Sequence, residues 1–412
     1  WLLQNGLTQH QYHQNNMGSF GGPNIVQDGL VFGYDTGYGV ANNSTATRYY
    51  PGEPTTNLQS ANQTSGQIAG MQGVGLTYVG EEDGYSKYSM SGTFSAGTYP
   101  YSMYLPGVSF TGGLSYSTQC ILKTNVENKF NYFGGGINYV NQAMNSGGTN
   151  SSVLQLDGSH LIKRQGFNYV STTTQSGYIH SNPVNNTTFN SSTDFIYIKN
   201  FQIEQNTHCT PYTATSRSNT ASLIDLENTI PIDLSAISFD STAQPDFDGV
   251  DDKITLSHTN SPITNISYEM WVKFDTIPAT NSYKSIWQKS ANWNTADGIS
   301  MQFIYGSFCW SYGNSWGGAV SYPQSNLTTG KYYHIVGTVD DVNGTNAKLY
   351  VDGVQVGSTG TGSNPTTTAV LNIGEGNGGR LDGSLSVFKM YNITLTADNV
   401  KQNYNAQKNR FL

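Results

Sequence analysis

The chain has 412 residues, of which 36% are hydrophobic, so it is long enough to form two or three domains with apolar cores. Its net charge of −8 is spread thinly, and the sequence contains no Lys/Arg cluster of the kind that binds nucleic acid or an anionic membrane. No apolar run approaches the roughly 20 residues that a membrane-spanning helix needs. We therefore expect a globular protein that neither binds nucleic acid nor inserts into a membrane.

Only 11% of the residues are charged, while glycine (46 residues) and tyrosine (28 residues) are abundant. This composition favours short strands joined by polar turns, because the exposed faces of long helices are usually rich in Lys and Glu. We therefore expect an all-β protein.

Three cysteines are present, at Cys120, Cys209 and Cys309, without a CxxC pair or a neighbouring pair of histidines. This pattern excludes a zinc ribbon. We expect three separately buried thiols, since free cysteines are often buried. A disulfide between Cys120 and Cys209 is the alternative.

The N-terminal segment 1–22 contains no Asp, Glu, Lys or Arg and ends in glycines. We expect an extended arm that adds to the edge of a neighbouring sheet through main-chain hydrogen bonds. A disordered tail is the alternative, because chain termini usually fray. The first residue is neither Met nor part of a signal-peptide pattern, so we expect a processed start or a fragment. The arm residues that we expect to mediate assembly are Trp1, Leu2, Leu3, Leu7 and Tyr12.

The stretch NIVQDGLVFGYDTGYG, residues 24–39, predicts a β-strand closed by a glycine turn. Alternation with a period of two places Leu30, Phe32 and Tyr34 on one face of this strand. The next stretch, NNSTATRYYPGEPTTNL, carries two prolines and many turn formers, which is typical of a connector between domains.

From about residue 57 to 217, short strand-like runs recur between turn clusters, and this spacing indicates a β-sandwich. The runs include YSTQCILKT, FNYVSTTTQSGYIHS and DFIYIKNFQIEQNTHCTPY. In this order they resemble the jelly-roll, carbohydrate-binding-module-like domains of phage and bacterial surface proteins. The resemblance carries no sugar-contacting position over to this chain.

Residues 222–412 contain, in this order, PDFDGVDDKITL, SYEMWVKFD, KYYHIVGTVDD, AKLYVDGVQVG and LNIGEGNGGRLDGSLSVFKMYNITL. This segment resembles laminin-G-like, concanavalin A-like jelly rolls, although Tyr333 stands where the family usually has Trp. Asp352 and Gly353 predict the tight turn of a hairpin, since such a turn requires positive φ angles. The one convincing helix spans residues 397–407 and is capped by Thr396.

In phage-type members of this family, a strand of the form GLVFGYD opens the laminin-G-like domain and is soon followed by a segment like LIDLENTIPIDLSAISFDS. In this chain the strand stands at 24–39 and the following segment only at 223–241. The resemblance therefore implies that a second jelly roll is inserted in the first loop of the C-terminal sandwich. The expected organisation is an arm (1–22), the first strand or strands of the sandwich (23–50), the inserted jelly roll (55–216) and the rest of the sandwich (217–412).

Concanavalin A-like sandwiches include glycoside hydrolases, which use two carboxylates about 5–5.5 Å apart when they retain configuration. The comparable strand here, SYEMWVKFD, offers Glu269 alone, with Trp271 and Lys273 on the same face. His334 has no nucleophile motif beside it, so we expect a core histidine. We therefore expect no enzymatic activity.

Asp251, Asp252 and Asp340 lie in acidic turns that could hold calcium, a cation that needs six or more oxygen ligands. Adjacent residues on a strand point to opposite faces and rarely share an ion. We therefore expect solvated turn charges and no cofactor, with calcium as the alternative.

Several aromatic residues lie close together in the sequence between residues 287 and 316. Flat rings edged by amide and hydroxyl groups suit the stacking of a sugar. The candidates for glycan contact are Trp287, Trp293, Trp310, Trp316 and Tyr312. Burial in the core is the alternative, because sandwiches bury their large side chains.

These patterns predict a non-enzymatic structural subunit of a virion surface or of an extracellular filament or lattice. It would self-associate through its arm, with lectin-like glycan binding as a possible second role. A monomeric carbohydrate-binding lectin or adhesin is the alternative, and a polysaccharide hydrolase is less favoured.

Overall fold

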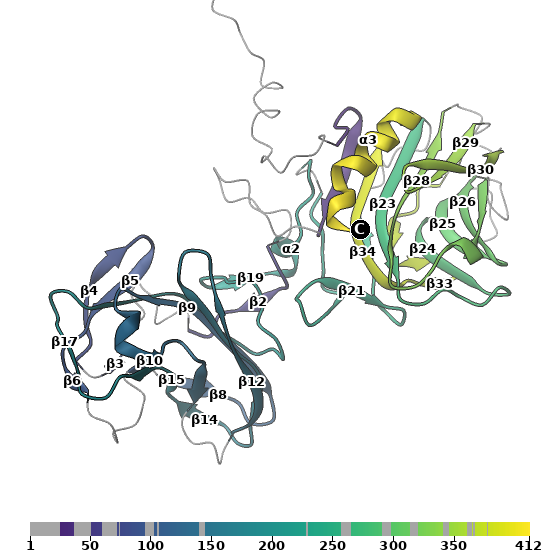
Figure 1. Cartoon of the computed structure of the whole chain (residues 1–412). Helices are drawn as coiled ribbons and strands as arrows, with labels where there is room; N and C mark the ends of the chain where they lie inside the picture. Colours follow the sequence, from purple (N-terminus) through teal and green to yellow (C-terminus); the bar gives the residue numbers. More distant parts are fainter. Residues whose placement is uncertain are drawn as a thin grey trace, which may run out of the picture. The chain divides into compact units, whose positions relative to one another are not determined.

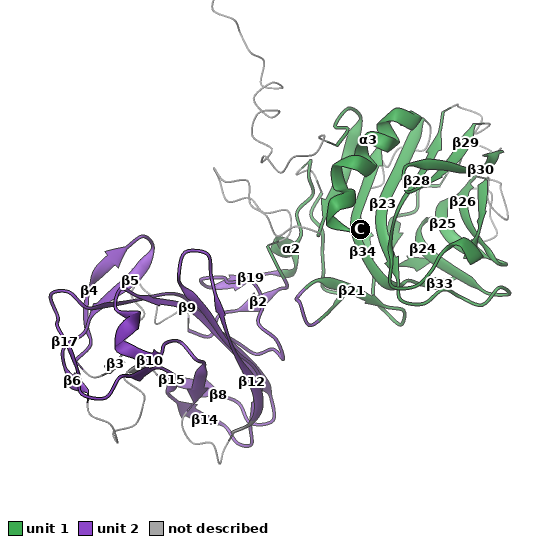
Figure 2. Cartoon of the chain, viewed as in Figure 1, with its two compact units in different colours: residues 1–52, 219–240, 244–412 green, residues 53–218, 241–243 purple. Residues whose placement is uncertain are grey.

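The computed structural model describes the chain except for residues 1–24, 37–50, 60–71, 74, 95–102, 105–106, 140–144, 228–229, 257–264, 291–297, 314–319, 341–345, 361–364, 366 and 377. Strands predominate in the described part and its helices are short, which confirms the all-β fold class. The chain divides into two compact units (Figure 2): unit 1 comprises residues 1–52, 219–240 and 244–412, and unit 2 comprises residues 53–218 and 241–243. Unit 2 therefore separates the first strand of unit 1 from the remainder of that unit.

Unit 1 is built on two antiparallel sheets. The larger sheet has the strand order β20-β21-β34-β23-β28-β29-β30, and β1 also pairs with β34. Its strands are β1 (Leu30–Asp35), β20 (Ser238–Phe239), β21 (Pro245–Asp248), β23 (Ile266–Phe274), β28 (Tyr332–Val339), β29 (Ala347–Val351), β30 (Val354–Gly360) and β34 (Asp382–Tyr391). The smaller sheet has the order β22-β31-β24-β25-β26-β27. Its strands are β22 (Ile254–Leu256), β24 (Tyr283–Lys289), β25 (Ile299–Ile304), β26 (Ser307–Tyr312), β27 (Val320–Pro323) and β31 (Leu371–Ile373).

Short elements complete unit 1. The hairpin of β32 (Glu375–Gly376) and β33 (Gly379–Arg380) follows β31. The helical turns are α2 (Asn219–Ser222) and η4 (Gln324–Asn326). The β29–β30 hairpin turns at Asp352 and Gly353 with φ angles of 51° and 79°, as the sequence predicts.

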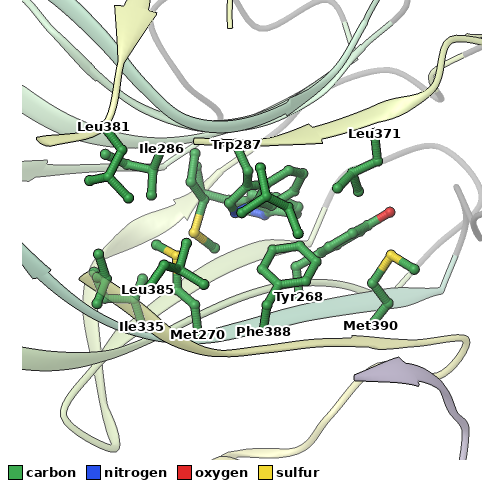
Figure 3. Packing of buried hydrophobic residues seen from close by; sticks show 14 of the residues in the cluster. Tyr268, Met270, Ile286, Trp287, Ile335, Leu371, Leu381, Leu385, Phe388 and Met390 are labelled. Atoms are coloured by element: carbon green, nitrogen blue, oxygen red, sulfur yellow. The ribbon is translucent and has the colours of Figure 1, made fainter. Parts of the chain in front are cut away.

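The two sheets enclose the hydrophobic core of unit 1 (Figure 3). Trp287 of the smaller sheet stacks on Tyr268 of the larger one, with ring centroids 4.5 Å apart. Residue 337 of β28 must be a glycine, because a Cβ atom there would lie 2.6 Å from the ring of Trp310. Burial of each such large side chain contributes about 1.5–3 kcal/mol to stability.

Strand β1 lies in the larger sheet, where it pairs with β34 and Tyr34 is opposite Phe388. Phe32 and Tyr34 belong to the core of unit 1. Leu30 does not, because the register shifts between Leu30 and Phe32 and Leu30 packs against a separate cluster that contains Val400. The prediction that all three side chains share one face is therefore wrong for Leu30, since a bulge breaks the period of two.

Helix α3 (Ala397–Gln407) begins and ends where the sequence predicts, and it lies against the larger sheet (Figure 1). The hydroxyl of Thr396 accepts a hydrogen bond from the main-chain N–H of Asn399, whose side chain accepts one from the N–H of Thr396. This capping box satisfies two amides that the helix leaves free at its start. Val400 and Asn403 are buried on the sheet side, and η5 (Lys408–Arg410) follows.

Unit 2 is also built of antiparallel strands. Its largest sheet has the order β12-β13-β9-β18-β5-β4, a second has β11-β15-β7-β3, and the pairs β10-β16, β14-β8, β17-β6 and β19-β2 complete it. The strands are β2 (Thr55–Thr56), β3 (Gln72–Gly73), β4 (Thr77–Glu82), β5 (Tyr85–Ser89), β6 (Gly92–Phe94), β7 (Met103–Tyr104), β8 (Val108–Phe110), β9 (Ser115–Thr124), β10 (Phe130–Tyr132), β11 (Ile137–Tyr139), β12 (Asn145–Leu154), β13 (His160–Tyr169), β14 (Thr173–Gln175), β15 (Gly177–Ile179), β16 (Asn182–Pro183), β17 (Thr187–Phe189), β18 (Phe195–Glu204) and β19 (Ser216–Arg217), with η3 at Glu127–Lys129.

Unit 2 has a hydrophobic core of its own, rich in packed aromatic rings. Tyr139 stacks on Phe167 with ring centroids 5.2 Å apart, and Phe110 stacks on Tyr169 at 4.5 Å.

All three cysteines of the chain, Cys120, Cys209 and Cys309, are buried free thiols, as expected.

The two ends of unit 2 are fastened to each other. Strand β2, near the start of the unit, pairs with β19, near its end. The guanidinium of Arg217 donates from Nε to the carbonyl oxygen of Glu53 at 2.8 Å. The side-chain oxygen of Asn57 accepts a hydrogen bond from the main-chain N–H of Ile203 at 3.2 Å. A domain whose two ends lie close together can be inserted into a loop of another domain without distorting that domain.

We predict that residues 53–218 fold as an isolated protein, because they contain their own core and their own end closure. The expected result is a single cooperative unfolding transition by circular dichroism. Arg217→Ala should lower the free energy of unfolding by about 1–3 kcal/mol, since it leaves the part-buried carbonyl of Glu53 without that donor. Absence of a cooperative transition in the isolated segment would contradict the prediction.

Candidate functional site

Three of the sequence-predicted glycan contacts lie in the core of unit 1. Trp287, Trp310 and Tyr312 are fully buried and point between the two sheets. They cannot stack on an external sugar, so their assignment as glycan contacts is wrong. The physical reason in β26 is the period of two, which places Trp310 and Tyr312 on the core face. In β24 a register shift between Ser285 and Trp287 turns Trp287 to the same face.

The other two tryptophans, Trp293 and Trp316, lie outside the described residues, as do the arm residues Trp1, Leu2, Leu3, Leu7 and Tyr12. The strands that flank the two tryptophans are described. Strand β24 ends at Lys289, which pairs with Ile299 at the start of β25, and Ile299 pairs with Tyr312 at the end of β26. The connections that carry Trp293 and Trp316 therefore leave the smaller sheet from the same end.

The outward face of the smaller sheet carries two rows of uncharged polar side chains, which we call the polar face. Paired positions across five strands form the first row, and paired positions across four strands form the second. The first row is Thr255, Asn372, Gln288, Ser300 and Ser311, and the second is Ser285, Gln302, Cys309 and Ser321. No position of the polar face carries a formal charge. Thr255 and Ser321 are exposed and Gln302 and Asn372 are half-buried, whereas the other five side chains are buried.

The polar face is a set of hydrogen-bond donors and acceptors. Thr255 donates to the side chain of Asn372 at 3.0 Å, and Gln302 donates to the hydroxyl of Ser311 at 3.3 Å. The hydroxyl of Ser285 is buried and has no hydrogen-bond partner within the described part of the chain. Hydroxyl and amide groups both donate and accept, so this arrangement suits an uncharged ligand with many hydroxyl groups.

The β32–β33 hairpin closes one side of the polar face. A Cβ atom at Gly376 would lie 2.4 Å from the side chains of Gln288 and Ser285. The hairpin therefore approaches β24 so closely that only glycine fits at this position. Glu375 and Arg380 form an ion pair within the hairpin.

The acidic turn after β21 brings three carboxylates together. The ligand oxygens of Asp248, Asp251 and Asp252 all lie within 4.8 Å of one another. Asp252 is buried and accepts hydrogen bonds from the main-chain N–H groups of Ser238 at 2.6 Å and Asp248 at 2.8 Å. Burial raises the pKa of Asp252, whereas hydrogen bonds from main-chain N–H groups of the turn lower the pKa of Asp248.

The turn thus juxtaposes Asp251 and Asp252 despite their alternation in sequence, and it adds Asp248, which sequence reasoning missed. Asp340 is exposed and does not belong to this group. Carboxylate oxygens are ligands that calcium accepts, but three of them here, both of Asp252 and one of Asp248, already accept hydrogen bonds from main-chain amides. The calcium alternative stays a prediction.

Glu269, the one acid on the strand comparable to a hydrolase active site, is fully buried on the side of the larger sheet that faces α3. Its Oε1 lies 2.7 Å from Nζ of Lys389 and 3.2 Å from Nε2 of His334. Its Oε2 accepts hydrogen bonds from Asn403 of α3 and, at 3.4 Å, from the hydroxyl of Tyr391. His334 is completely buried, as expected of a core histidine.

The partners of Glu269 keep its carboxyl group ionised. Burial alone would raise the pKa of this carboxyl, but the charge of Lys389 and the contacts with His334 outweigh burial and lower its pKa to about 2. A carboxylate without access to solvent, neutralised by a lysine, is a structural group in this sheet and does not meet an external substrate.

Residues 248–401 match the model of a protein family described as the concanavalin A-like lectin/glucanases superfamily. The match confirms the resemblance that the sequence of this segment suggests. No curated protein matches the chain.

Solved structures with partial likeness include a Trypanosoma rangeli sialidase in complex with 2,3-difluorosialic acid, with 14% identity and a TM-score of 0.35. This chain covers 31% of the sialidase, through 45% of its own length. Domain 4 of an extracellular arabinanase from Geobacillus stearothermophilus, in complex with arabinotriose, has 16% identity and a TM-score of 0.33, with 45% of this chain and 93% of that domain covered. The binding domain of botulinum neurotoxin serotype D has 14% identity and a TM-score of 0.34, with 46% of this chain and 50% of that chain covered.

Among the described residues, no helix has the length and apolarity needed to cross a membrane.

We predict that unit 1 loses stability as the pH falls from about 4.5 to about 2, the interval between the ordinary and the lowered pKa of Glu269. Below its ordinary pKa the unfolded state binds a proton that the folded state does not, so acid favours unfolding by up to about 3 kcal/mol. Chemical denaturation followed by tryptophan fluorescence at a series of pH values measures this loss.

The matched control is the double variant Glu269→Gln with Lys389→Met, which removes both charges together. Other carboxylates contribute equally in both proteins, so the double variant should show a shallower dependence on pH. Equal slopes in the two proteins would contradict the assigned role of Glu269.

Proposed function

We propose that this chain is a non-catalytic, carbohydrate-binding structural protein of an extracellular or virion surface, and that the polar face of unit 1 contacts a neutral glycan. The observation that carries the proposal is the two-row set of uncharged polar side chains across the smaller sheet, of which Thr255, Asn372, Gln302 and Ser321 are accessible. Sugars present hydroxyl groups in similar density, and such groups bind best to paired donors and acceptors. The family match over residues 248–401 is consistent with a lectin-like role.

The end of the sheet where the connections bearing Trp293 and Trp316 depart adjoins Ser300 and Ser311 of the first row. Aromatic rings placed there would supply the stacking surface that the polar face lacks. In this proposal, the two tryptophans give affinity and the polar face orients the sugar. The buried position of Glu269 supports a binding role without hydrolysis, since it leaves the strand without an accessible acid.

The proposed second property is self-association through the uncharged N-terminal arm, residues 1–22, into a filament or lattice. The support is the composition of the arm, which contains hydrogen-bonding side chains and apolar residues but no Asp, Glu, Lys or Arg. Such a segment can add a strand to a sheet edge of another copy without burying charge.

A glycan array of neutral polysaccharides tests the binding role. Gln302→Ala should weaken binding about tenfold, the effect of losing one well-placed hydrogen-bonding group in a desolvated contact. Trp293→Ala and Trp316→Ala should each weaken it further, with Ser358→Ala, on exposed strand β30 of the other sheet, as the control. Retention of full affinity in all three variants, or no bound glycan, would sink the proposal.

Deletion of residues 1–20 tests the assembly role. The full chain should scatter light as an oligomer, and the shortened chain should have the mass of a monomer, because strand addition is lost. An unchanged mass after deletion would exclude the arm as the assembly element.

A further inference from the structure

A second surface of different chemistry lies on unit 2, where lysines rest on aromatic rings. It occupies the outward face of the six-stranded sheet, on strands β5, β18 and β9. Tyr197 of β18 pairs with Lys87 of β5 on one side and with Lys123 of β9 on the other. These three side chains therefore form one row across three neighbouring strands. Lys199 projects from the same face of β18, two residues further along.

The rings hold the ammonium groups in place. Nζ of Lys199 lies 3.9 Å from the ring centre of Tyr85, and Nζ of Lys123 lies 4.2 Å from the same centre. The two charges are therefore at most 8.1 Å apart, the sum of these distances. Nζ of Lys87 lies 4.0 Å from the ring centre of Phe195. Cation–π contacts of this kind fix a lysine side chain that would otherwise be mobile.

The positive charges exceed the negative charges at this surface. Lys87 pairs with Glu82 at 2.7 Å, and Asp157 accepts a hydrogen bond from Tyr85 at 3.3 Å. Within the described ranges, no carboxylate lies within ion-pair distance of Lys123 or Lys199. Glu82 and Asp157 still interact with Lys123 and Lys199 through their charges, so three lysines face two carboxylates at this surface. The ammonium groups of Lys123 and Lys199, each with several N–H donors and no ion-pair contact, form a site for an anion.

We propose that this lysine–aromatic face binds the acidic groups of a polysaccharide that carries carboxylates or sulfates. The face consists of Tyr85, Lys87, Lys123, Phe195, Tyr197 and Lys199. The ammonium groups contact the acidic groups, and the outward face of the sheet supports the extended sugar chain between them. The site lies in unit 2 and does not depend on the polar face of unit 1.

The geometry disfavours nucleic acid as the ligand. Proteins that bind single strands stack bases on open aromatic faces. Here Tyr85 is 2% exposed and Tyr197 is 8% exposed, because the lysine side chains cover their rings. Glu82 and Asp157 also border the cluster, which prevents the long positive stripe that a phosphate backbone requires.

Binding of the full chain to immobilised alginate, heparin, dextran and a single-stranded DNA tests the proposal. Alginate carries carboxylates, heparin adds sulfates, and dextran is neutral. Comparing binding to the three polysaccharides therefore shows whether carboxylates or sulfates are recognised. The double variant Lys123→Gln with Lys199→Gln should bind alginate or heparin at least tenfold more weakly, with a smaller dependence on salt. The matched control is Lys348→Gln with Lys401→Gln, which removes the same charge from unit 1 and should bind as the unaltered chain does.

The variant Lys123→Arg with Lys199→Arg keeps both charges and should retain binding, which separates a loss of charge from a loss of folding. Equal weakening in the matched control would overturn the proposal, because it would show a general charge effect. So would absence of binding to both acidic polysaccharides, an equal loss of dextran binding in the variant Lys123→Gln with Lys199→Gln, or preferential binding to DNA. Absence of neutral-glycan binding at the polar face would leave this result unaffected, since the two sites lie in different units.

Discussion

The buried ion pair between Glu269 and Lys389 is the constraint around which unit 1 is arranged. The two residues face each other across the central strands β23 and β34, and both are completely buried. Removing two charges from water costs several kcal/mol for each, so the groups around them must supply hydrogen bonds in place of water. This requirement explains why α3 packs on the sheet with polar residues at its buried positions.

Helix α3 completes the network and extends it to the start of the chain. Gln407 accepts a hydrogen bond from Nζ of Lys389 at 3.0 Å and donates one to Asp35 of β1 at 3.2 Å. Asn403 accepts a hydrogen bond from the main-chain N–H of Val26 at 2.7 Å. The segment before unit 2 is thereby tied to the end of the chain by buried polar contacts. An interruption between β1 and the rest of unit 1 is tolerated because these contacts do not depend on the intervening sequence.

Local patterns in the sequence were sufficient for the features that depend on neighbouring residues. The cap at Thr396, the turn at Asp352 and the strand that begins the sandwich follow from side-chain chemistry and a period of two. The bulge beside Leu30 does not, because a shift of register depends on the partner strand. The glycan contacts predicted at Trp287, Trp310 and Tyr312 were wrong for a related reason. Alternation shows that Trp310 and Ser311 lie on opposite faces of β26, but only the position of the second sheet determines which face is the core.

The lysine–aromatic face illustrates why the net charge of a chain and its runs of like charge are poor predictors of where an anion could bind. Lys87, Lys123 and Lys199 are far apart in the sequence, and only the pairing of β5, β18 and β9 brings them together. At physiological salt, charges interact over about 8 Å. Lys123 and Lys199 lie about this far apart, so their fields add, although the chain as a whole carries a charge of −8. A protein acidic as a whole can therefore attract an anion at one face, and the fold, rather than the composition, determines where.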